Sequence, residues 1–252
     1  MAGYLQFVLH SHLPFVLSHG RWPHGADWIF EASAETYIPL LQNLHKSKQL
    51  GTPLKFTIGI SPVLLEQLSH PSFSEQFSEY LKMKISSAEN DKKYFDEISD
   101  IQRLNLADMW KKFYTGVLRF FESIQGDIVS EFRRWQDMEF IEIITCAATH
   151  GYLPLLGTDN SVYAQIAVAK EVHKRHFGVD PKGIWLPEAA YRPGYEWIPP
   201  VGNDKTPRLR KGIEQFLYNL DIRFFVVDSH LLKGGKAIGV YIDRFEALKK
   251  LW

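Results

Sequence analysis

The chain has 252 residues, 45% of them hydrophobic, and is long enough to bury one large core as a single domain. Lysine plus arginine (29) equals aspartate plus glutamate (29), and no long basic run occurs, so the footprint expected of a nucleic-acid-binding or anionic-lipid-binding protein is missing. The single cysteine, Cys146, excludes an internal disulfide and a cysteine-based zinc site. With no apolar run of membrane-spanning length and no apparent leader, we expect a soluble cytoplasmic protein.

Strands and helices are predicted to alternate along the chain, which indicates parallel β/α architecture, open or closed. Apolar, β-prone stretches predict five strands, at residues 4–10, 54–60, 141–146, 182–186 and 224–228. Helical spacing predicts helices at residues 31–46, 62–68, 161–177 and 209–220, the second of them opened by Ser61 as its N-cap and Pro62 as its first residue. Residues 71–138 have helical patterning and no convincing strand, so we expect a helical insertion there.

The stretch around Glu188 reads Gly-Ile-Trp-Leu-Pro-Glu and places a carboxylate directly after a strand. The apolar residues form the end of a buried strand, and Pro187 ends the strand ladder because it has no backbone donor. In β/α folds, catalytic groups gather at the rim formed by the carboxyl ends of the strands. We therefore predict that Glu188 is the central catalytic residue, against the plainer interpretation of a glutamate that caps a loop.

Histidines follow two of the other predicted strands. His10 and His12 lie two residues apart at the end of the first strand, and His150 follows the third. A His-x-His pair can bind zinc or hydrogen-bond a polar ligand, and a metal site would need a further ligand from His150, Asp228 or His230. The residues alone leave both interpretations open and favour the polar ligand.

Asp228 is the next strand-end carboxylate after Glu188. Retaining glycoside cleavage needs a nucleophile and an acid/base about 5 Å apart, so spacing alone would pair these two residues. Trp28 and Trp185 could stack on a sugar ring, although a tryptophan more often serves packing. Aromatic residues make up 14% of the chain, which is compatible with a sugar site or an aromatic core.

Four motifs, in this order, resemble those of glycoside hydrolase family 57, and within it the α-glucan branching enzymes. They are His10-Ser11-His12-Leu13-Pro14, the run from Ala148 to Leu156, Trp185-Leu186-Pro187-Glu188 with the following Ala-Ala-Tyr, and the run from Phe225 to His230. The likeness covers the chain essentially throughout.

This resemblance implies a distorted TIM-like (β/α)7 barrel and a retaining mechanism without a metal or other cofactor. It implies an α-glucan substrate and Glu188 as the nucleophile. The covalent glucosyl intermediate would pass to a 6-hydroxyl, which makes a branch, or to water, which is hydrolysis. The side chains expected to bind the substrate are His10, His12, Trp28, His150, Trp185, Asp228 and His230.

The chain departs from the family's pattern in two ways. First, the family's acid/base is an aspartate on a later strand, well beyond Asp228, and the sequence reaches Trp252 without such a motif. We therefore expect the chain alone to be inactive, and the resemblance does not imply the pairing of Asp228 with Glu188. Five strands are predicted where the barrel needs seven, so we expect the N-terminal part of a larger catalytic domain, unstable alone and completed by a missing C-terminal half. In addition, residues 231–240 lack the tyrosine that in branching relatives shields the intermediate from water.

Three alternatives to a branching enzyme stay open at this point. One is a non-catalytic α-glucan-binding remnant of an enzyme. Another is a hydrolase of the same family, of the α-amylase or 4-α-glucanotransferase type. The third is a hydrolase with a histidine-bound metal, such as a polysaccharide deacetylase. Neither nucleic acid nor a membrane is expected as a partner.

Overall fold

A computed structural model of the chain describes residue 3 and residues 5–52, 54–199, 201, 203 and 205–228. Its strands are β1 (Val8–Ser11), β2 (Phe56–Ile60), β3 (Ile141–Cys146), β4 (Gly183–Trp185), β5 (Tyr195–Trp197), β6 (Arg208–Arg210) and β7 (Phe224–Val226). Its α-helices are α1 (Ala26–Ala32), α2 (Ile38–Gln49), α3 (Pro62–Leu68), α4 (Pro71–Glu97), α5 (Ile101–Ser123), α6 (Ile128–Asp137), α7 (Asp159–Phe177) and α8 (Ile213–Asn219). A π-helical turn, η1 (Ser33–Tyr37), joins α1 to α2, and two 3-10 turns are η2 (Leu153–Leu155) and η3 (Pro187–Ala189).

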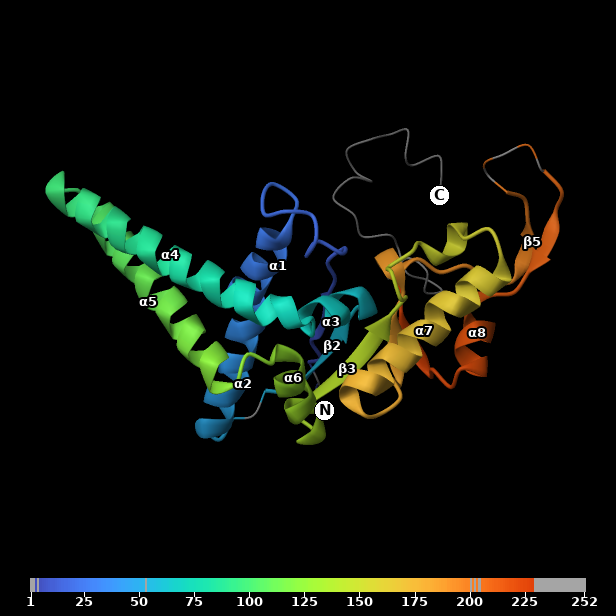
Figure 1. The fold of residues 1–252 in the computed structure, drawn as a ribbon. Coiled ribbons are helices and arrows are strands. Elements are labelled where there is room, and N and C mark those ends of the chain that lie inside the picture. The colour runs from blue at the N-terminus through green and yellow to red at the C-terminus, as the bar shows by residue number, and fades with distance from the viewer. Residues whose placement is uncertain are drawn as a thin grey trace.

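The main sheet has five parallel strands in the order β1-β2-β3-β4-β7 and forms half of a barrel (Figure 1). Each strand reaches its parallel neighbour through a helical crossover, as the alternating pattern of the sequence predicts. The predicted incomplete α/β barrel is thus confirmed. The first strand differs in its bounds: it begins at Val8 and extends to Ser11, so His10 lies within the strand.

A second sheet is an antiparallel pair, β5 with β6, which the sequence analysis missed. The helix predicted at residues 209–220 begins later than expected, because Leu209 lies in β6 and the helix begins at Ile213. The Arg210 side chain explains the difference, because it is buried in an ion pair with Asp159 and lies 4.9 Å over the Trp197 ring. Contacts between distant residues therefore fix this strand, where local spacing suggested a helix.

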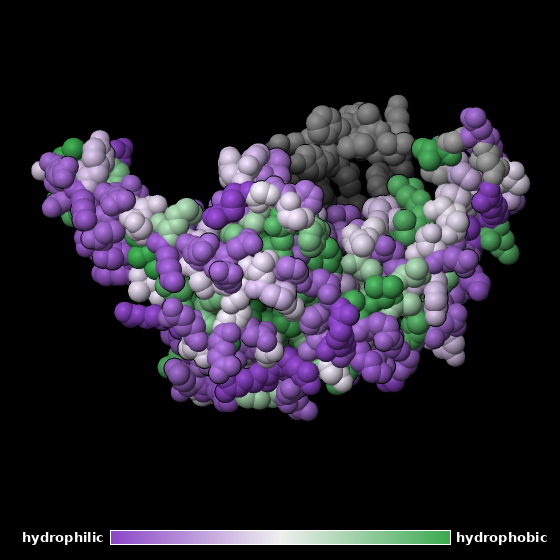
Figure 2. All heavy atoms as spheres, in the orientation of Figure 1, coloured by the Kyte–Doolittle hydropathy of each residue, from purple (hydrophilic) through white to green (hydrophobic). Residues whose placement is uncertain are grey.

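The predicted helical insertion between β2 and β3 is confirmed and consists of α4, α5 and α6. The antiparallel helices α4 and α5 extend away from the sheet as a long arm (Figure 1). Hydrophilic residues cover most of the arm, and hydrophobic side chains gather over the central body (Figure 2). The helix predicted at residues 31–46 is also longer than expected, since α1, η1 and α2 form one continuous helical segment.

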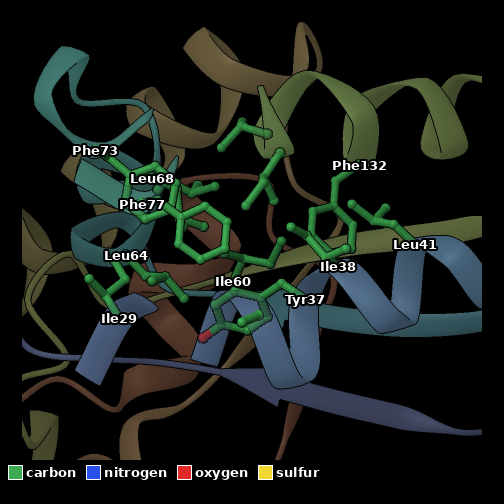
Figure 3. Packing of buried hydrophobic residues seen from close by; sticks show 14 of the residues in the cluster. Ile29, Tyr37, Ile38, Leu41, Ile60, Leu64, Leu68, Phe73, Phe77 and Phe132 are labelled. Atoms are coloured by element: carbon green, nitrogen blue, oxygen red, sulfur yellow. The ribbon is translucent and has the colours of Figure 1, made fainter. Parts of the chain in front are cut away.

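The main core lies where the arm, α1 to α3 and the sheet meet. Side chains from separate helices and from β2 converge there, including Phe73 and Phe77 of α4 and Ile60 of β2 (Figure 3). A second cluster packs α7 and α8 against β4, around Ile166, Ile184 and Phe216. In both clusters, helices pack closely against the sheet. This packing holds the strands as a rigid platform.

No helix in the described part of the chain is long and apolar enough to cross a membrane. Apolar side chains are exposed along the β1 edge of the sheet, with Leu5 81% and Phe7 59% accessible. At the opposite edge, Phe224 of β7 is 40% accessible. Both edges of the half-barrel thus present apolar residues to solvent.

Candidate active site

The carboxyl ends of β1, β3 and β4 bring His10, His12, His150, Trp185 and Glu188 to one rim of the half-barrel. The parallel register explains this, since His10 pairs with Gly59 of β2 and Cys146 pairs with Trp185. Residues far apart in sequence therefore meet where the strands end.

The three histidines form a compact stack. The rings of His12 and His150 lie 3.8 Å apart at 12°, and His10 Nε2 lies 3.2 Å from His150 Nε2. His12 Nδ1 is bonded to the hydroxyl of Ser61 at 2.9 Å. Each ring therefore has its orientation set by a neighbour within the cluster.

Below the stack, His10 packs on the indole of Trp185, with centroids 4.8 Å apart and planes at 10°. Gly59 makes room for both residues, because a methyl group at this position would lie 3.1 Å from His10 Nδ1 and 3.5 Å from Trp185 Cβ. His10 thus covers one face of the Trp185 indole, and a sugar could stack only on the other face.

Glu188 lies beside this stack, with its Oε1 4.0 Å from His150 Nδ1. The side chains differ sharply in accessibility: Glu188 is 72% exposed, whereas His150 is 11% exposed. Glu188 therefore offers its carboxylate to solvent or a ligand, and His150 supports it from the protein side.

Glu188 and His150 both have left-handed backbones, with φ of 57° and 59°. Non-glycine residues seldom adopt this region, and such conformations persist where the surroundings over-determine them. Pro187 and the 3-10 turn η3 supply this restraint for Glu188, and the bond from His150 N to Ala147 O supplies it for His150. The strained backbone sets the direction of both side chains at the rim.

The electrostatics of the cluster favour neutral imidazoles. Burial lowers the pKa of His10 to about 4, and the nearby His150 and His12 add to the shift. Burial and His150 likewise lower the pKa of His12 to about 4. Burial also lowers the pKa of His150, although the Glu188 carboxylate acts in the opposite direction. Neutral rings can donate and accept hydrogen bonds, as a polyhydroxylated ligand requires.

In the described residues, one group of side chains has the spacing to hold a metal ion: His10, Cys146 and His150, whose possible ligand atoms lie within 4.8 Å of one another. Binding through sulfur would need a thiolate, and burial raises the pKa of the Cys146 thiol to about 12. The thiol is fully buried at the end of β3, as expected of a small core residue. The expectation that the site works without a metal stays a prediction.

Two further predicted site residues come from other elements of the fold. Trp28 is on α1, 44% exposed, and within the described residues its recorded ring contact is with His24 at 5.9 Å. Asp228 lies two residues after β7, the strand that pairs with β4, and is exposed. His230 and the segment 231–240 lie outside the described residues.

Sequence reasoning missed three residues that hold the rim in place: Gly59, Ser61 and Gln165. The Gln165 amide of α7 accepts from Thr149 N at 3.0 Å and donates to the Thr149 hydroxyl at 2.8 Å. A serine before a proline predicts only a helix cap, and glycine and glutamine are too common to mark a site. Their roles become visible when the partner strands are in place.

Comparison with known proteins gives a consistent result. The profile of glycosyl hydrolase family 57 matches residues 6–245. The chain is 44% identical over 243 residues to the 1,4-alpha-glucan branching enzyme TK1436 of Thermococcus kodakarensis, covering 96% of this chain and 34% of that protein. It is 27% identical over 219 residues to a probable 1,4-alpha-glucan branching enzyme of Mycobacterium tuberculosis, covering 77% of this chain and 39% of that protein.

Among solved structures, a GH57-type branching enzyme from Pyrococcus horikoshii superposes with a TM-score of 0.89 at 43% identity, covering 93% of this chain and 43% of that one. The alpha-amylase AmyC of Thermotoga maritima gives 0.74 at 28% identity, with 89% and 40% covered. The chain thus spans well under half the length of these relatives. The family match over nearly the whole sequence and the common half-barrel together show that the chain belongs to glycosyl hydrolase family 57.

Proposed function

We propose that the chain forms the nucleophile-bearing part of a retaining α-glucan branching enzyme, with Glu188 as the nucleophile. The observation that carries this proposal is the placement of the Glu188 carboxylate. It is exposed at the rim, held by a left-handed backbone, and lies 4.0 Å from a buried histidine. The likeness to branching enzymes in sequence and fold supports the choice of substrate.

In this mechanism, a Glu188 oxygen attacks the anomeric carbon of an α-1,4-linked glucose while the bond to the departing chain breaks. A protonated acid must supply the proton that the leaving oxygen takes, and the family resemblance implies an aspartate on a later strand for this role. The neutral histidines His10, His12 and His150 bind hydroxyl groups of the attacked sugar. A 6-hydroxyl oxygen of another chain then attacks the glucosyl group, its proton passes to the deprotonated acid, and the bond to Glu188 breaks to release the carboxylate. This transfer creates an α-1,6 branch.

We further infer that Trp28, Trp185, Asp228 and His230 belong to the substrate-binding surface around this centre. We propose residues 1–252 as the N-terminal part of the catalytic domain, which a C-terminal part of the same enzyme would complete. A role in glycogen-like polymer synthesis and a cytoplasmic location fit the proposed activity and the single, buried cysteine.

The test is replacement of Glu188 by glutamine in the full-length protein. Glu188→Gln keeps the shape of the side chain and removes the nucleophilic oxygen, so turnover of amylose should fall by about 10³-fold or more while amylose binding is kept. The matched control is Glu171→Gln on the exposed face of α7, which should retain full activity. Unchanged turnover in Glu188→Gln would refute the proposal, and amylose binding without turnover in either form would favour a non-catalytic binding protein.

Hydrolysis is the second candidate, because the fold also matches an α-amylase at 28% identity. Transfer and hydrolysis share the intermediate on Glu188 and differ in the acceptor. Product analysis separates them: a branching enzyme increases α-1,6 linkages with few new reducing ends, whereas a hydrolase releases one reducing end for each bond that it cleaves.

A further inference from the structure

Ser61 occupies the N-cap position of α3 and does not cap the helix. Its backbone has the extended conformation of an N-cap, with φ of −69° and ψ of 143°, and Pro62 follows at the first helical position. Its side chain nevertheless makes no bond to the first turn. Serine is among the best N-cap residues because its hydroxyl usually satisfies one of the free N–H groups of that turn.

Other helices of the chain use their caps in the usual way. The Asp127 side chain accepts from Ser130 N at 2.8 Å at the start of α6, and Thr158 accepts from Ser161 N at 3.1 Å at the start of α7. At α3 the hydroxyl is bonded to His12 Nδ1 at 2.9 Å. The Ser61 hydroxyl thus bonds His12 at the rim in place of a backbone N–H group of α3.

The position of the Ser61 hydroxyl is fixed from both sides. Ser61 N donates to Ser11 O at 3.0 Å, which ties the residue to the end of β1, and Ser61 O accepts from Leu64 N and Leu65 N of α3. The residue is fully buried. A hydroxyl held in this way acts on the adjacent imidazole as a fixed partner rather than as a mobile surface group.

The bond also determines which ring atoms of His12 remain available. The His12 ring stacks on His150 at 3.8 Å, and His150 in turn lies beside Glu188. With Nδ1 bonded to Ser61, the Nε2 atom is the remaining polar atom of the ring. A hydroxyl can donate to Nδ1 or accept from it, so this bond fixes the orientation of the ring.

We propose that Ser61 is a positioning residue of the active site, whose hydroxyl holds His12 in one orientation instead of capping α3. This inference rests on the proposed function, because its catalytic effect requires that His12 binds the attacked sugar. At metal sites, partners that orient a ligating histidine influence activity by about 10-fold to 100-fold, and we expect an effect of similar order for the bond between Ser61 and His12.

The test compares Ser61→Ala, Ser61→Gly and Ser61→Thr in the full-length protein. Glycine is nearly as good an N-cap as serine but has no hydroxyl, whereas threonine keeps the hydroxyl. We expect kcat/KM on amylose to fall by about tenfold or more in the alanine and glycine variants and to recover to within about threefold in the threonine variant. The alanine and glycine variants lose the bond to His12 but no capping bond, so their melting temperatures should fall only by the small amount that one hydrogen bond contributes.

The control is Asp127→Ala, which removes a side chain that does cap its helix, α6. It should lower the melting temperature and leave kcat/KM unchanged, the reverse of the Ser61 pattern. If Ser61→Gly keeps wild-type kcat/KM, the inference is overturned.

A second readout does not depend on turnover. In protein labelled with ¹⁵N-histidine, the Nδ1 signal of His12 should shift in Ser61→Gly, which removes the hydroxyl bonded to this atom, and should stay near its wild-type position in Ser61→Thr. If the His12 signal changes in this way but the wild type does not turn over glucan, the result supports the role of Ser61 and counts against the proposed function. An unchanged His12 Nδ1 signal in Ser61→Gly would overturn the role of Ser61, whatever Glu188→Gln shows.

Discussion

At the scale of single residues, His10 fits against β2 because Gly59 has no side chain. The imidazole packs between this glycine and the indole of Trp185, and its Nδ1 lies 3.1 Å from the position that a β-carbon on residue 59 would occupy. A contact this short forces the ring to shift, and its bond to His150 would lengthen.

We predict that Gly59→Ala lowers kcat by about tenfold, because small displacements in a catalytic site cost much of its rate. Gly116→Ala is the matched control, since a methyl group on this exposed helical glycine meets nothing within 4 Å. The control should keep its activity and gain about 0.5–1 kcal/mol of stability. Equal kinetics of the two variants, measured side by side, would show that His10 is not held by Gly59.

The lowered pKa values of His10 and His12 make the site sensitive to acid. Both values of about 4 lie below the 6.5 of an unfolded histidine, so the folded protein keeps neutral rings at pH 7 and charges them only as the pH falls toward 4. The unfolded chain binds these protons first, so stability should decline as the pH drops below about 6.5.

We therefore predict that kcat/KM shows no inflection near pH 6.5 from these histidines and falls at pH values near 4. NMR titration of ¹⁵N-histidine should show the same late protonation of His10 and His12. Titration of both rings near pH 6.5 would contradict the buried, stacked arrangement.

At the scale of elements, α7 supports the loop that carries His150. The Gln165 side chain bonds twice to Thr149, and Gln165 O accepts from Ala148 N at 3.0 Å. Gly151 lies against the same amide. One residue of the helix thus holds the loop on both sides of the left-handed His150.

We predict that Gln165→Leu lowers kcat by about tenfold with a smaller change in KM, because His150 loses its fixed position beside Glu188. Gln102→Leu, on the exposed face of α5, removes the same group without touching the site. Gln165→Glu keeps an acceptor for Thr149 N and should restore part of the rate. If Gln165→Leu behaves as Gln102→Leu does, the helix plays no part in positioning His150.

Much of this arrangement could be predicted from the sequence, because local patterns determine it. The five parallel strands and the helical insertion follow from apolar periodicity, and the motifs place Glu188 and His150 at strand ends. The β5 and β6 hairpin could not be predicted, since Arg210 is held by Asp159, 51 residues away. The diversion of Ser61 from its cap to His12 likewise depends on a partner 49 residues away.

At the scale of the whole molecule, the half-barrel has two edge strands, β1 and β7, that expose apolar residues. Phe7 and Leu9 at one edge are 59% and 38% accessible, and Phe224 at the other is 40% accessible. Unpaired parallel edges with apolar side chains favour association with other chains.

We predict that residues 1–252 alone bind a hydrophobic dye, self-associate and unfold with lower cooperativity than the full-length protein. Light scattering and thermal unfolding of both proteins, at the same concentration, would check this. Equal cooperativity and no association of the 252-residue chain would show that the half-barrel is stable without further strands.

The most direct test of the central claim is chemical trapping of the intermediate on Glu188. The full-length protein is incubated with a fluorinated glucosyl fluoride, which forms a glycosyl–enzyme bond that is hydrolysed only slowly. The peptides of the protein are then mapped by mass spectrometry. We predict one glucosyl adduct, located on Glu188 and missing in Glu188→Gln. An adduct on another carboxylate such as Asp228, or turnover of the reagent without any adduct, would contradict the assignment of Glu188 as the nucleophile.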